Sequence, residues 1–341
     1  MQNKLAVVIL NYNGKRHLET FLPSVVSFSS PYQIIVADNC STDNSVSFLQ
    51  TNFPNVEIIQ NNENGGFAKG YNDALKKLEG RYEFYLLLNS DVEVTENWIE
   101  PLLHVFENEN CAGCQPKILS YADKNRFEHA GAAGGFIDKD YFPFCRGRIF
   151  EKTEIDSGQY DYPLEITWTS GAAMLIRSDL FHLVSGFDER FFAHMEEIDL
   201  CLRLGKKGYK FFCNPSSSVY HLGGGTLPYN SANKVYLNFR NNLFTLVKNH
   251  PGWLLPRLVK RMMLDGIAAF KFLSEGKFLF FWKIFLAHMQ LYINLPKLLK
   301  QRAELKIDKH VFKKYQGSIL WAYFVQKNKH FSELNSRKLD H

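Results

Sequence analysis

Short apolar runs that end in polar residues alternate with helical stretches along the first part of the chain. The runs are continuous and rich in Val, Ile and Leu, a composition typical of strands buried on both faces of a sheet. The predicted strands are residues 5–10, 33–37, 56–60 and 83–88, and the predicted helices are residues 16–29, 43–52 and 68–80. This alternation predicts an α/β fold with a mostly parallel central sheet flanked by helices.

The pattern changes twice further along the chain. Residues 115–165 are rich in Gly and aromatic residues and predict loops, after which we expect a strand at 166–177 and a helix at 194–207. From residue 226 onward the sequence is helical, basic and aromatic. We therefore predict an α/β domain over residues 1–225 and a helical C-terminal region over residues 226–341.

Charge supports the same division. Residues 226–341 contain 20 Lys and Arg and 6 Asp and Glu, a balance of +14, whereas residues 1–225 contain 20 and 29, a balance of −9. Two regions of opposite charge indicate two roles. The basic region carries no recognised nucleic-acid-binding motif, so we expect no nucleic-acid partner.

Cysteine content and the N-terminus indicate a cytoplasmic protein. Cys111 and Cys114 form a lone CxxC with no second pair, which does not favour a zinc site or a disulfide framework. The first residues lead directly into a strand without the features of a signal peptide. No uninterrupted apolar segment reaches the ~18 residues expected of a membrane span.

The most informative motif is the acidic end of the fourth predicted strand. The run Tyr85–Leu88 is followed by Asn89, Ser90 and Asp91, with Glu93 two residues later. A buried carboxylate without a partner is costly, and open α/β sheets bind ligands at the carboxyl ends of their strands. Asp91 and Glu93 can therefore share a divalent cation that holds the diphosphate of a nucleotide.

Four other motifs follow strands in order. Asn11-Tyr12-Asn13 follows the first strand, and Asp38-Asn39 begins a polar turn after the second. A Gly-rich turn covers residues 62–68, and an acidic motif runs from residues 187–192 to residues 196–200. With the Asn-Ser-Asp motif, this series resembles inverting glycosyltransferases of family 2 with the GT-A fold, especially the rhamnosyltransferase-like branch. The resemblance covers roughly residues 4–245.

The resemblance implies the Rossmann-like GT-A fold and a pocket for a nucleoside-diphosphate sugar. Its expected residues are Asn11, Asn13, Asp38, Asn39, Asn64, Gly65, Gly66, Asn72, Asn89, Ser90, Asp91 and Arg240. The alternatives are structural: Asp38 can close an Asx turn, the Gly-rich turn can simply start a helix, and Arg240 can cap a helix instead of binding the diphosphate. The turn is not a GxGxxG, which disfavours a dinucleotide fold.

A metal site is implied by the same family. Asp91 and Glu93 match its usual Asp-x-Asp, with Glu as a departure in the second place, and His221 resembles the histidine that completes the site in many relatives. The alternative for His221 is a structural role. We expect a divalent cation, and a histidine ligand is compatible with Mn²⁺ whereas Mg²⁺ prefers oxygen.

The catalytic base is expected at the start of the predicted helix 194–207. Helical spacing places Glu196, Asp199 and Arg203 on one face, where Arg203 can neutralise an acid. This leaves Glu197 most free, and Glu197 also aligns with the second acid of the Glu-Asp pair that supplies the base in the family. Glu196 is the reserve candidate, and a solvated acidic helix start is the structural alternative.

Acceptor binding is expected around Trp168, Ser170 and Gly171. Gly171 and its small neighbours allow a sugar to approach the backbone, and Trp168 offers an aromatic face for a pyranose ring. The segment looks like the acceptor side of the family, while a core strand is the alternative.

Residues 251–300 mix Trp and Phe with Lys and Arg. Such helices can lie in an anionic membrane interface, which suits a lipid-linked glycan acceptor. Packing on the catalytic domain or on a second subunit is the alternative.

We therefore predict a metal-dependent, inverting glycosyltransferase of cell-surface polysaccharide synthesis, cytoplasmic or peripheral on the inner face of the membrane. Family analogy makes dTDP-rhamnose a donor candidate beside UDP-sugars. A sugar-nucleotide pyrophosphorylase is a rival, although the Gly-rich basic loop that it needs after the first strand is missing. A non-catalytic glycan-binding protein with the same fold is a second rival.

Overall fold

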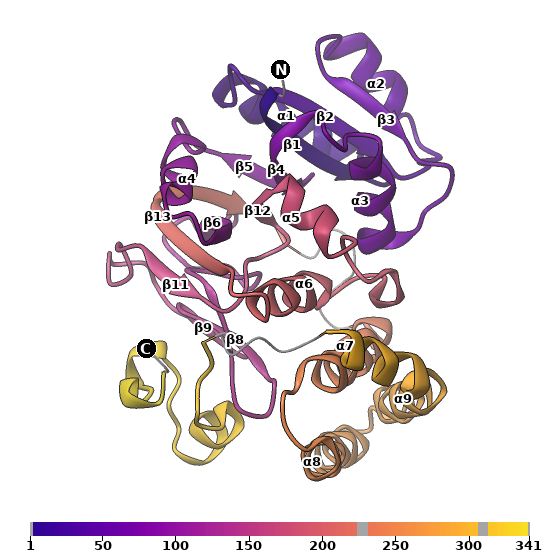
Figure 1. Ribbon diagram of the computed structural model, residues 1–341. Coiled ribbons are helices and arrows are strands. Elements are labelled where there is room, and N and C mark those ends of the chain that lie inside the picture. The colour runs from indigo at the N-terminus through magenta and orange to yellow at the C-terminus, as the bar shows by residue number, and fades with distance from the viewer. Residues whose placement is uncertain (1–2, 224–230, 306–312, 340–341) are drawn as a thin grey trace.

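The computed structural model describes residues 3–223, 231–305 and 313–339. A large central sheet dominates the fold (Figure 1). Its strands are β1 (Asn3–Asn11), β2 (Gln33–Asp38), β3 (Glu57–Gln60), β4 (Tyr82–Asn89), β5 (Val92–Val94), β6 (Cys111–Ser120), β11 (Leu164–Ile166), β12 (Ala173–Arg177) and β13 (Lys210–His221). Their order is β11-β13-β6-β12-β4-β1-β2-β3, and β5 pairs with β13.

Helices cover both faces of this sheet. They are α1 (Lys15–Phe28), α2 (Ser45–Asn52), α3 (Gly66–Lys76), α4 (Glu100–His104), α5 (Ser178–Leu183) and α6 (Glu196–Gly205). Successive residues of β1 alternate between two hydrophobic clusters: Val7 packs with residues of α1, α2 and α4, and Val8 packs with residues of α3, α5 and α6. Burial on both faces explains the continuous apolar runs in the sequence.

The predicted parallel strands are confirmed, but the sheet is mixed. β1, β2, β3 and β4 pair in parallel, whereas β12 runs antiparallel to β4 and to β6. The predicted strand 166–177 is wrong in extent, because it divides into β11 and β12 with a turn between them. β6 was missed because Gly113 and Pro116 weaken its strand pattern, although nearly all of it is buried.

Part of the predicted loop region forms a second, small sheet. Its strands are β7 (Gly135–Ile137), β8 (Pro143–Cys145), β9 (Arg148–Ile149) and β10 (Lys152–Thr153). The last described segment, 313–339, returns to this sheet, because Tyr315 bridges to Asp138 and to Leu339.

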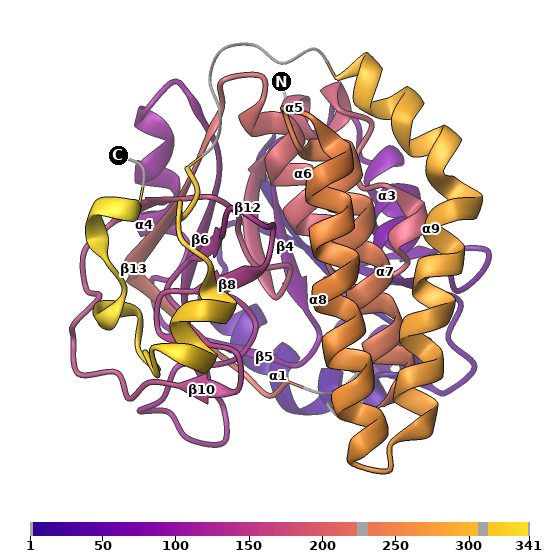
Figure 2. The ribbon, with the colours of Figure 1, turned by 90° about the horizontal axis from the view of Figure 1, so that it is seen from below.

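Three long helices follow the sheet domain: α7 (Ala232–Asn249), α8 (Leu254–Ser274) and α9 (Phe278–Glu304). Figure 2 shows them side by side. Leu243 of α7 and Leu291 of α9 belong to the same hydrophobic cluster as β1, so the C-terminal helices share a core with the sheet domain.

The length of α9 revises one expectation. α9 has 27 residues and is long and apolar enough to cross a membrane by length and composition. Only 17% of its most apolar window is buried inside the structure. The interrupted apolar run in the sequence therefore belongs to a longer helix than expected.

Candidate active site

Asn11 and Asp38 meet at the edge of the sheet, where β1 and β2 end opposite each other. The Asn11 Nδ2 donates to Asp38 Oδ1 at 3.0 Å, and the backbone N–H of Ser41 donates to Asp38 Oδ2 at 2.9 Å. Asp38 is buried. The two residues predicted to bind the nucleotide therefore lie together. By accepting the Ser41 N–H, Asp38 also closes a turn, which is the structural role considered as its alternative.

Asn13 organises the turns beside this edge. It adopts a φ of 49°, and its Oδ1 accepts hydrogen bonds from the backbone N–H groups of Thr42 at 2.7 Å and Asp43 at 3.2 Å. An open, polar hollow of about 600 Å³ lies here, lined by Asn13, Gly14, Lys15, Arg16, His17, Thr42, Asp43 and Asn44. Open α/β sheets bind ligands at this position.

The Gly-rich turn packs against Asn39 and Phe192, and its close approach to a nucleotide stays a prediction. Asn39 Nδ2 donates to Asn64 Oδ1 and to the Gly66 carbonyl, both at 3.0 Å. Gly66 has a φ of 74°, and a Cβ there would lie 2.6 Å from the Phe192 carbonyl oxygen. The same carbonyl accepts the Phe67 N–H at 2.7 Å. The absence of a side chain at Gly66 therefore allows the start of α3 to lie close to the Phe192 backbone.

Asn72 is a structural clamp rather than an exposed pocket residue. Its Nδ2 donates to the Phe187 carbonyl and its Oδ1 accepts the Phe187 N–H, both at 2.9 Å. Gly65 directly precedes α3, and a Cβ on Gly65 would lie 2.7 Å from the Lys69 side chain. Both ends of the Asn72 amide therefore hold the segment that leads to the acidic motif, and the nucleotide contact of Asn72 stays a prediction.

Asp91 and His221 face each other at the ends of β4 and β13. The Asp91 Oδ1 lies 3.2 Å from His221 Nε2, and Glu128 Oε2 lies 3.1 Å from His221 Nδ1. Asn89 Nδ2 is 3.4 Å from the same Nε2. Burial opposes the charged imidazole, but Asp91 and Glu128 outweigh it and raise the pKa of His221 to about 10. The imidazole is thus held between two carboxylates.

Glu93 does not join this pair. Its carboxylate forms an ion pair with Lys124, which corrects the expected sharing of a cation with Asp91. Ser90 lies beside the turn after β1, because its Oγ is 3.6 Å from the position that a Cβ on Gly14 would take. Two of the three predicted metal ligands, Asp91 and His221, are brought together.

The pair fits a divalent cation as a partial ligand set. Within residues 3–223, 231–305 and 313–339, no group of three or more His, Cys, Asp and Glu is arranged to hold a metal by itself. A carboxylate oxygen and an imidazole nitrogen 3.2 Å apart are nevertheless ligands of the kind that suits Mn²⁺. Metals at nucleotide sites commonly take one or two protein ligands and complete their shell with phosphate and water.

Glu196 and Glu197 begin α6 and carry buried carboxylate oxygens. Oε2 of each has no hydrogen-bond partner among the described residues. Burial raises the pKa of Glu197 to about 7, and burial followed by the charge of Glu197 raises the pKa of Glu196 well above its ordinary value. A carboxylate with a pKa near neutrality is suited to accept a proton.

The turn before these acids is strained and held from α7. Phe192, His194 and Met195 all have positive φ, between 63° and 73°, a conformation that costs energy for residues other than glycine. Asn241 Nδ2 lies within 3.0 Å of the Phe191, Ala193 and His194 carbonyl oxygens. This one side-chain amide therefore fixes the conformation from which Glu196 and Glu197 project.

Arg240 supports the same turn. Its Nη2 donates to the carbonyl oxygens of Arg190 at 2.8 Å and Phe191 at 2.9 Å. The guanidinium thus holds a loop, a structural role of the kind considered as the alternative, and the contact with a diphosphate stays a prediction.

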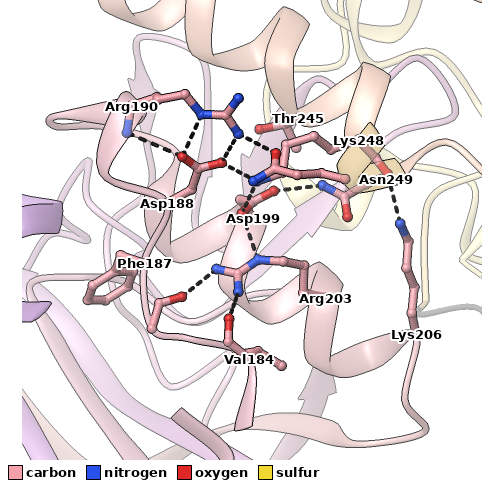
Figure 3. Close-up of polar contacts among 12 residues, drawn as sticks. Val184, Phe187, Asp188, Arg190, Asp199, Arg203, Lys206, Thr245, Lys248 and Asn249 are labelled. Atoms are coloured by element: carbon pink, nitrogen blue, oxygen red, sulfur yellow. Dashed lines mark hydrogen bonds and ion pairs between the residues drawn. The ribbon is translucent and has the colours of Figure 1, made fainter. Parts of the chain in front are cut away.

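A buried ionic network joins α6 to α7 (Figure 3). Lys248 Nζ lies 2.7 Å from Asp188 Oδ2 and 2.8 Å from Asp199 Oδ2. Arg203 Nε lies 2.8 Å from Asp199 Oδ2, which confirms the predicted pairing of Arg203 with an acid of its own helix. Asp199 and Lys248 are almost completely buried. With Asp199 neutralised, the acids that remain unpaired in this segment are Glu196 and Glu197.

The predicted acceptor segment is mostly buried. Trp168 is only 5% exposed, its Nε1 donates to the Phe136 carbonyl at 2.9 Å, and its ring covers Gly135. This corrects the expected stacking on a sugar. Ser170 is buried, and its N–H donates to Gln115.

Gly171 connects this segment with the Gly-rich turn. A Cβ on Gly171 would lie 3.0 Å from the Phe67 ring, so the loop before β12 touches the start of α3. The predicted acceptor segment and the Gly-rich turn are therefore adjacent, although Trp168 and Ser170 of the acceptor segment are buried.

Shared electrostatic neighbours connect the two halves of the site. Burial raises the pKa of the Cys145 thiol to about 11, and the charges of Glu128 and Glu197 both add to this rise. Lys234 likewise lies within electrostatic reach of both His194 and Glu128.

Two residues of the site, Glu128 and Lys248, were missed in the sequence, and Asn241 was given no role although it follows Arg240 directly. Glu128 lies in a loop, and Lys248 lies on α7. A signal for Lys248 was its polarity within a helix that must bury one face, where it is 1% exposed.

The comparisons with known proteins agree with this geometry. The family model of Glycosyl transferase family 2 matches residues 6–179. The chain belongs to glycosyltransferase family 2. An N-acetylglucosaminyl-diphospho-decaprenol L-rhamnosyltransferase of Mycobacterium tuberculosis is 26% identical over 268 residues, which cover 74% of this chain and 87% of the relative. The dTDP-rhamnosyl transferase RfbF of Shigella flexneri is 24% identical over 270 residues, 75% of this chain and 84% of the relative.

A solved structure shows the same fold at lower identity. GalNAc-T7 with UDP, GalNAc and Mn²⁺ superposes with a TM-score of 0.62 at 14% identity, covering 96% of this chain and 57% of the other. The GT-A fold predicted from the strand-end motifs is thus confirmed.

Proposed function

We propose that this glycosyltransferase transfers rhamnose from dTDP-rhamnose to a lipid-linked glycan in cell-surface polysaccharide synthesis. The activities that give the Mycobacterium and Shigella relatives their names support both the donor and the acceptor. UDP-sugars are the second donor class, because GalNAc-T7 was solved with UDP. The observation that carries the reaction type is Glu197, a carboxylate with a buried oxygen that has no hydrogen-bond partner among the described residues and with a pKa that burial raises to about 7.

The mechanism is a single displacement. Glu197 accepts the proton of an acceptor hydroxyl while that oxygen attacks the anomeric carbon from the face opposite the leaving diphosphate. The C–O bond to the diphosphate breaks as the new glycosidic bond forms, so the configuration inverts without a covalent enzyme intermediate. The pKa of Glu197, raised to about 7 by burial, suits a group that must gain and release a proton near neutral pH.

Asp91 and His221 would hold a divalent cation, for which Mn²⁺ is the first choice. When bound, the cation neutralises the charge that develops on the diphosphate leaving group. Glu128 contributes by fixing the His221 ring through Nδ1 at 3.1 Å, so that Nε2 points toward Asp91.

The donor nucleotide would occupy the edge formed by β1 and β2. Asn11 Oδ1 is buried and has no hydrogen-bond partner among the described residues, and the hollow beside Asn13 is open and polar. The α/β domain of residues 1–225 would thus carry the chemistry. The helical region of residues 226–341 would position α6 and keep the enzyme at the inner face of the membrane.

A donor screen tests this proposal. Thermal stability is measured with dTDP-rhamnose, UDP-sugars and GDP-mannose, each with and without Mn²⁺ or Mg²⁺. We expect dTDP-rhamnose with Mn²⁺ to stabilise most and to be hydrolysed slowly or transferred. Stabilisation without any turnover would favour a glycan-binding protein, and formation of a nucleotide sugar from a sugar phosphate would favour a pyrophosphorylase.

A further inference from the structure

The solvent side of α8 is apolar. Leu255, Val259, Met263, Ile267 and Phe270 recur every three or four residues and therefore lie on one face of the helix. Their exposed fractions are 60, 49, 67, 67 and 65%. A surface helix of a globular protein ordinarily places polar side chains on this face, so the pattern requires an apolar partner.

The neighbouring helix also carries exposed apolar side chains. Phe278, Trp282, Phe285 and Ile293 of α9 are 63, 44, 42 and 69% exposed, again at intervals that keep them near one face of that helix. Trp253, just before α8, is 79% exposed. Large apolar side chains exposed in such number are typical of interaction sites on soluble proteins.

The two helices form one unit. The ring of Phe270 lies 5.8 Å from that of Phe281, and the ring of Phe272 lies 5.2 Å from that of Phe280. Farther from the turn, the Tyr292 hydroxyl lies 3.8 Å from Met262 Sδ. We call the exposed residues Trp253, Leu255, Val259, Met263, Ile267, Phe270, Phe278, Leu279, Trp282, Phe285 and Ile293 the hairpin face.

The segment that carries the hairpin face is basic. Residues 254–304 contain nine Lys and Arg and three Asp and Glu, a balance of 9 − 3 = +6. Asp265 is buried against Arg261, Glu275 is paired with Lys277, and Arg257 and Lys260 contact Asp140 of the sheet domain. Exposed Trp and Phe with flanking cations are the composition of helices that lie in an anionic lipid interface.

Two other occupants fit less well. A two-fold contact between copies of this chain would bring two faces with a balance of +6 together, which is repulsive. A membrane-spanning α9 would have to leave α7 and the shared core, in which Leu291 and Leu298 are fully buried. It would also expose His288, which lies 3.3 Å from Asp265 Oδ2.

We propose that the hairpin face docks the enzyme parallel to an anionic membrane surface, with its aromatic side chains in the headgroup region and its cations toward the lipid phosphates. The proposal rests on the proposed function for its purpose, since a lipid-linked acceptor lies in that surface. Its physical basis is independent of the sugar that is transferred.

Vesicle binding of the full chain tests the proposal. Vesicles of phosphatidylcholine alone are compared with vesicles that also contain phosphatidylglycerol, by co-sedimentation at low and high salt. The test variant is Leu255→Glu with Met263→Glu and Ile267→Glu. The matched control is Val26→Glu with Ile155→Glu and Leu183→Glu, three side chains of the sheet domain that are 39, 58 and 55% exposed.

The proposal expects the unchanged protein and the control to bind the anionic vesicles, with weaker binding at high salt. The test variant should bind at least about tenfold less, because three side chains no longer enter the interface. It should keep the unfolding temperature and the donor hydrolysis of the unchanged protein, since these positions face solvent.

Three results would overturn the proposal. Equal vesicle binding by the test variant and the control would place the contact elsewhere. A dimer that dissociates in the test variant, without vesicle binding, would make the hairpin face an interface between copies. Resistance of the bound protein to alkaline carbonate extraction would make α9 a membrane span. Each result leaves sugar transfer measurable, so failure of the docking proposal is distinct from failure of the proposed function.

Discussion

Replacing Lys248 by Met removes the cation at the centre of the buried network that joins α6 to α7. Lys248 is 1% exposed and its Nζ contacts Asp188 at 2.7 Å and Asp199 at 2.8 Å. In the variant, Asp199 keeps Arg203 at 2.8 Å and Asp188 keeps Arg190. Each buried carboxylate thus loses one of its two charged partners, while methionine fills most of the space left by lysine.

The free energy of unfolding should fall by about 3–5 kcal/mol, the cost of breaking a buried ion pair by removing one partner. Burial raises the pKa of Asp188, but Arg190 and Lys248 outweigh it and hold the pKa well below its ordinary value. Stability from this group is therefore present above the unfolded pKa and is lost as pH falls through the folded pKa. Removing Lys248 raises the folded pKa, so acid destabilisation should begin at higher pH.

Urea unfolding at pH 7 and at several lower pH values measures both effects. Lys300→Met is the control, because Lys300 is 80% exposed and its contact with Glu304 is 3.9 Å; its effect should be at most about 1 kcal/mol. Adding Asp188→Asn to Lys248→Met should restore part of the stability. A Lys248→Met protein as stable as the control would refute the reasoning that this network fixes α6.

Three further predictions concern the site. The rate of transfer, as kcat/KM, should rise as pH increases through about 7, because the base must be ionised and burial raises the pKa of Glu197 to about 7; a flat profile between roughly pH 5.5 and 8.5 would contradict this. Glu128→Gln should weaken Mn²⁺ binding, followed by electron paramagnetic resonance, by about 10–100-fold, and unchanged affinity would count against its orienting role. Gly66→Ala should lower the unfolding temperature more than Gly80→Ala, because both have φ near 75° but only Gly66 faces the Phe192 carbonyl, whereas Gly80 has open space; equal losses would show that backbone strain alone matters.

The sequence predicted the part of the fold that follows from local pattern. Continuous apolar runs identified β1 to β4, and their polar ends placed Asn11, Asp38 and Asp91 at one edge, because parallel strands share their carboxyl end. His221 was also found this way, since it ends a strand. The mixed half of the sheet was less predictable, because β6 contains Gly and Pro and its burial depends on distant elements.

The supporting residues were beyond local pattern for a physical reason. Asn241 and Lys248 act on segments about 50 residues away in the sequence, and only the packing of α7 on α6 brings them there. Trp168 shows the converse error: an aromatic residue beside small ones suggested a sugar platform, but the same composition builds a tight contact with Gly135. A pattern indicates residue types for a site, while exposure decides which of them can meet a substrate.

The identity of the base is the central claim, and Glu197→Gln tests it most directly. Glutamine keeps the size and the backbone contacts of α6 but cannot accept the proton. Sugar transfer is measured together with the affinity for the nucleoside diphosphate in the presence of Mn²⁺. We predict a loss of about 10²–10⁴-fold in kcat with nucleotide affinity essentially unchanged. A variant that transfers sugar at the rate of the unchanged enzyme would contradict the account.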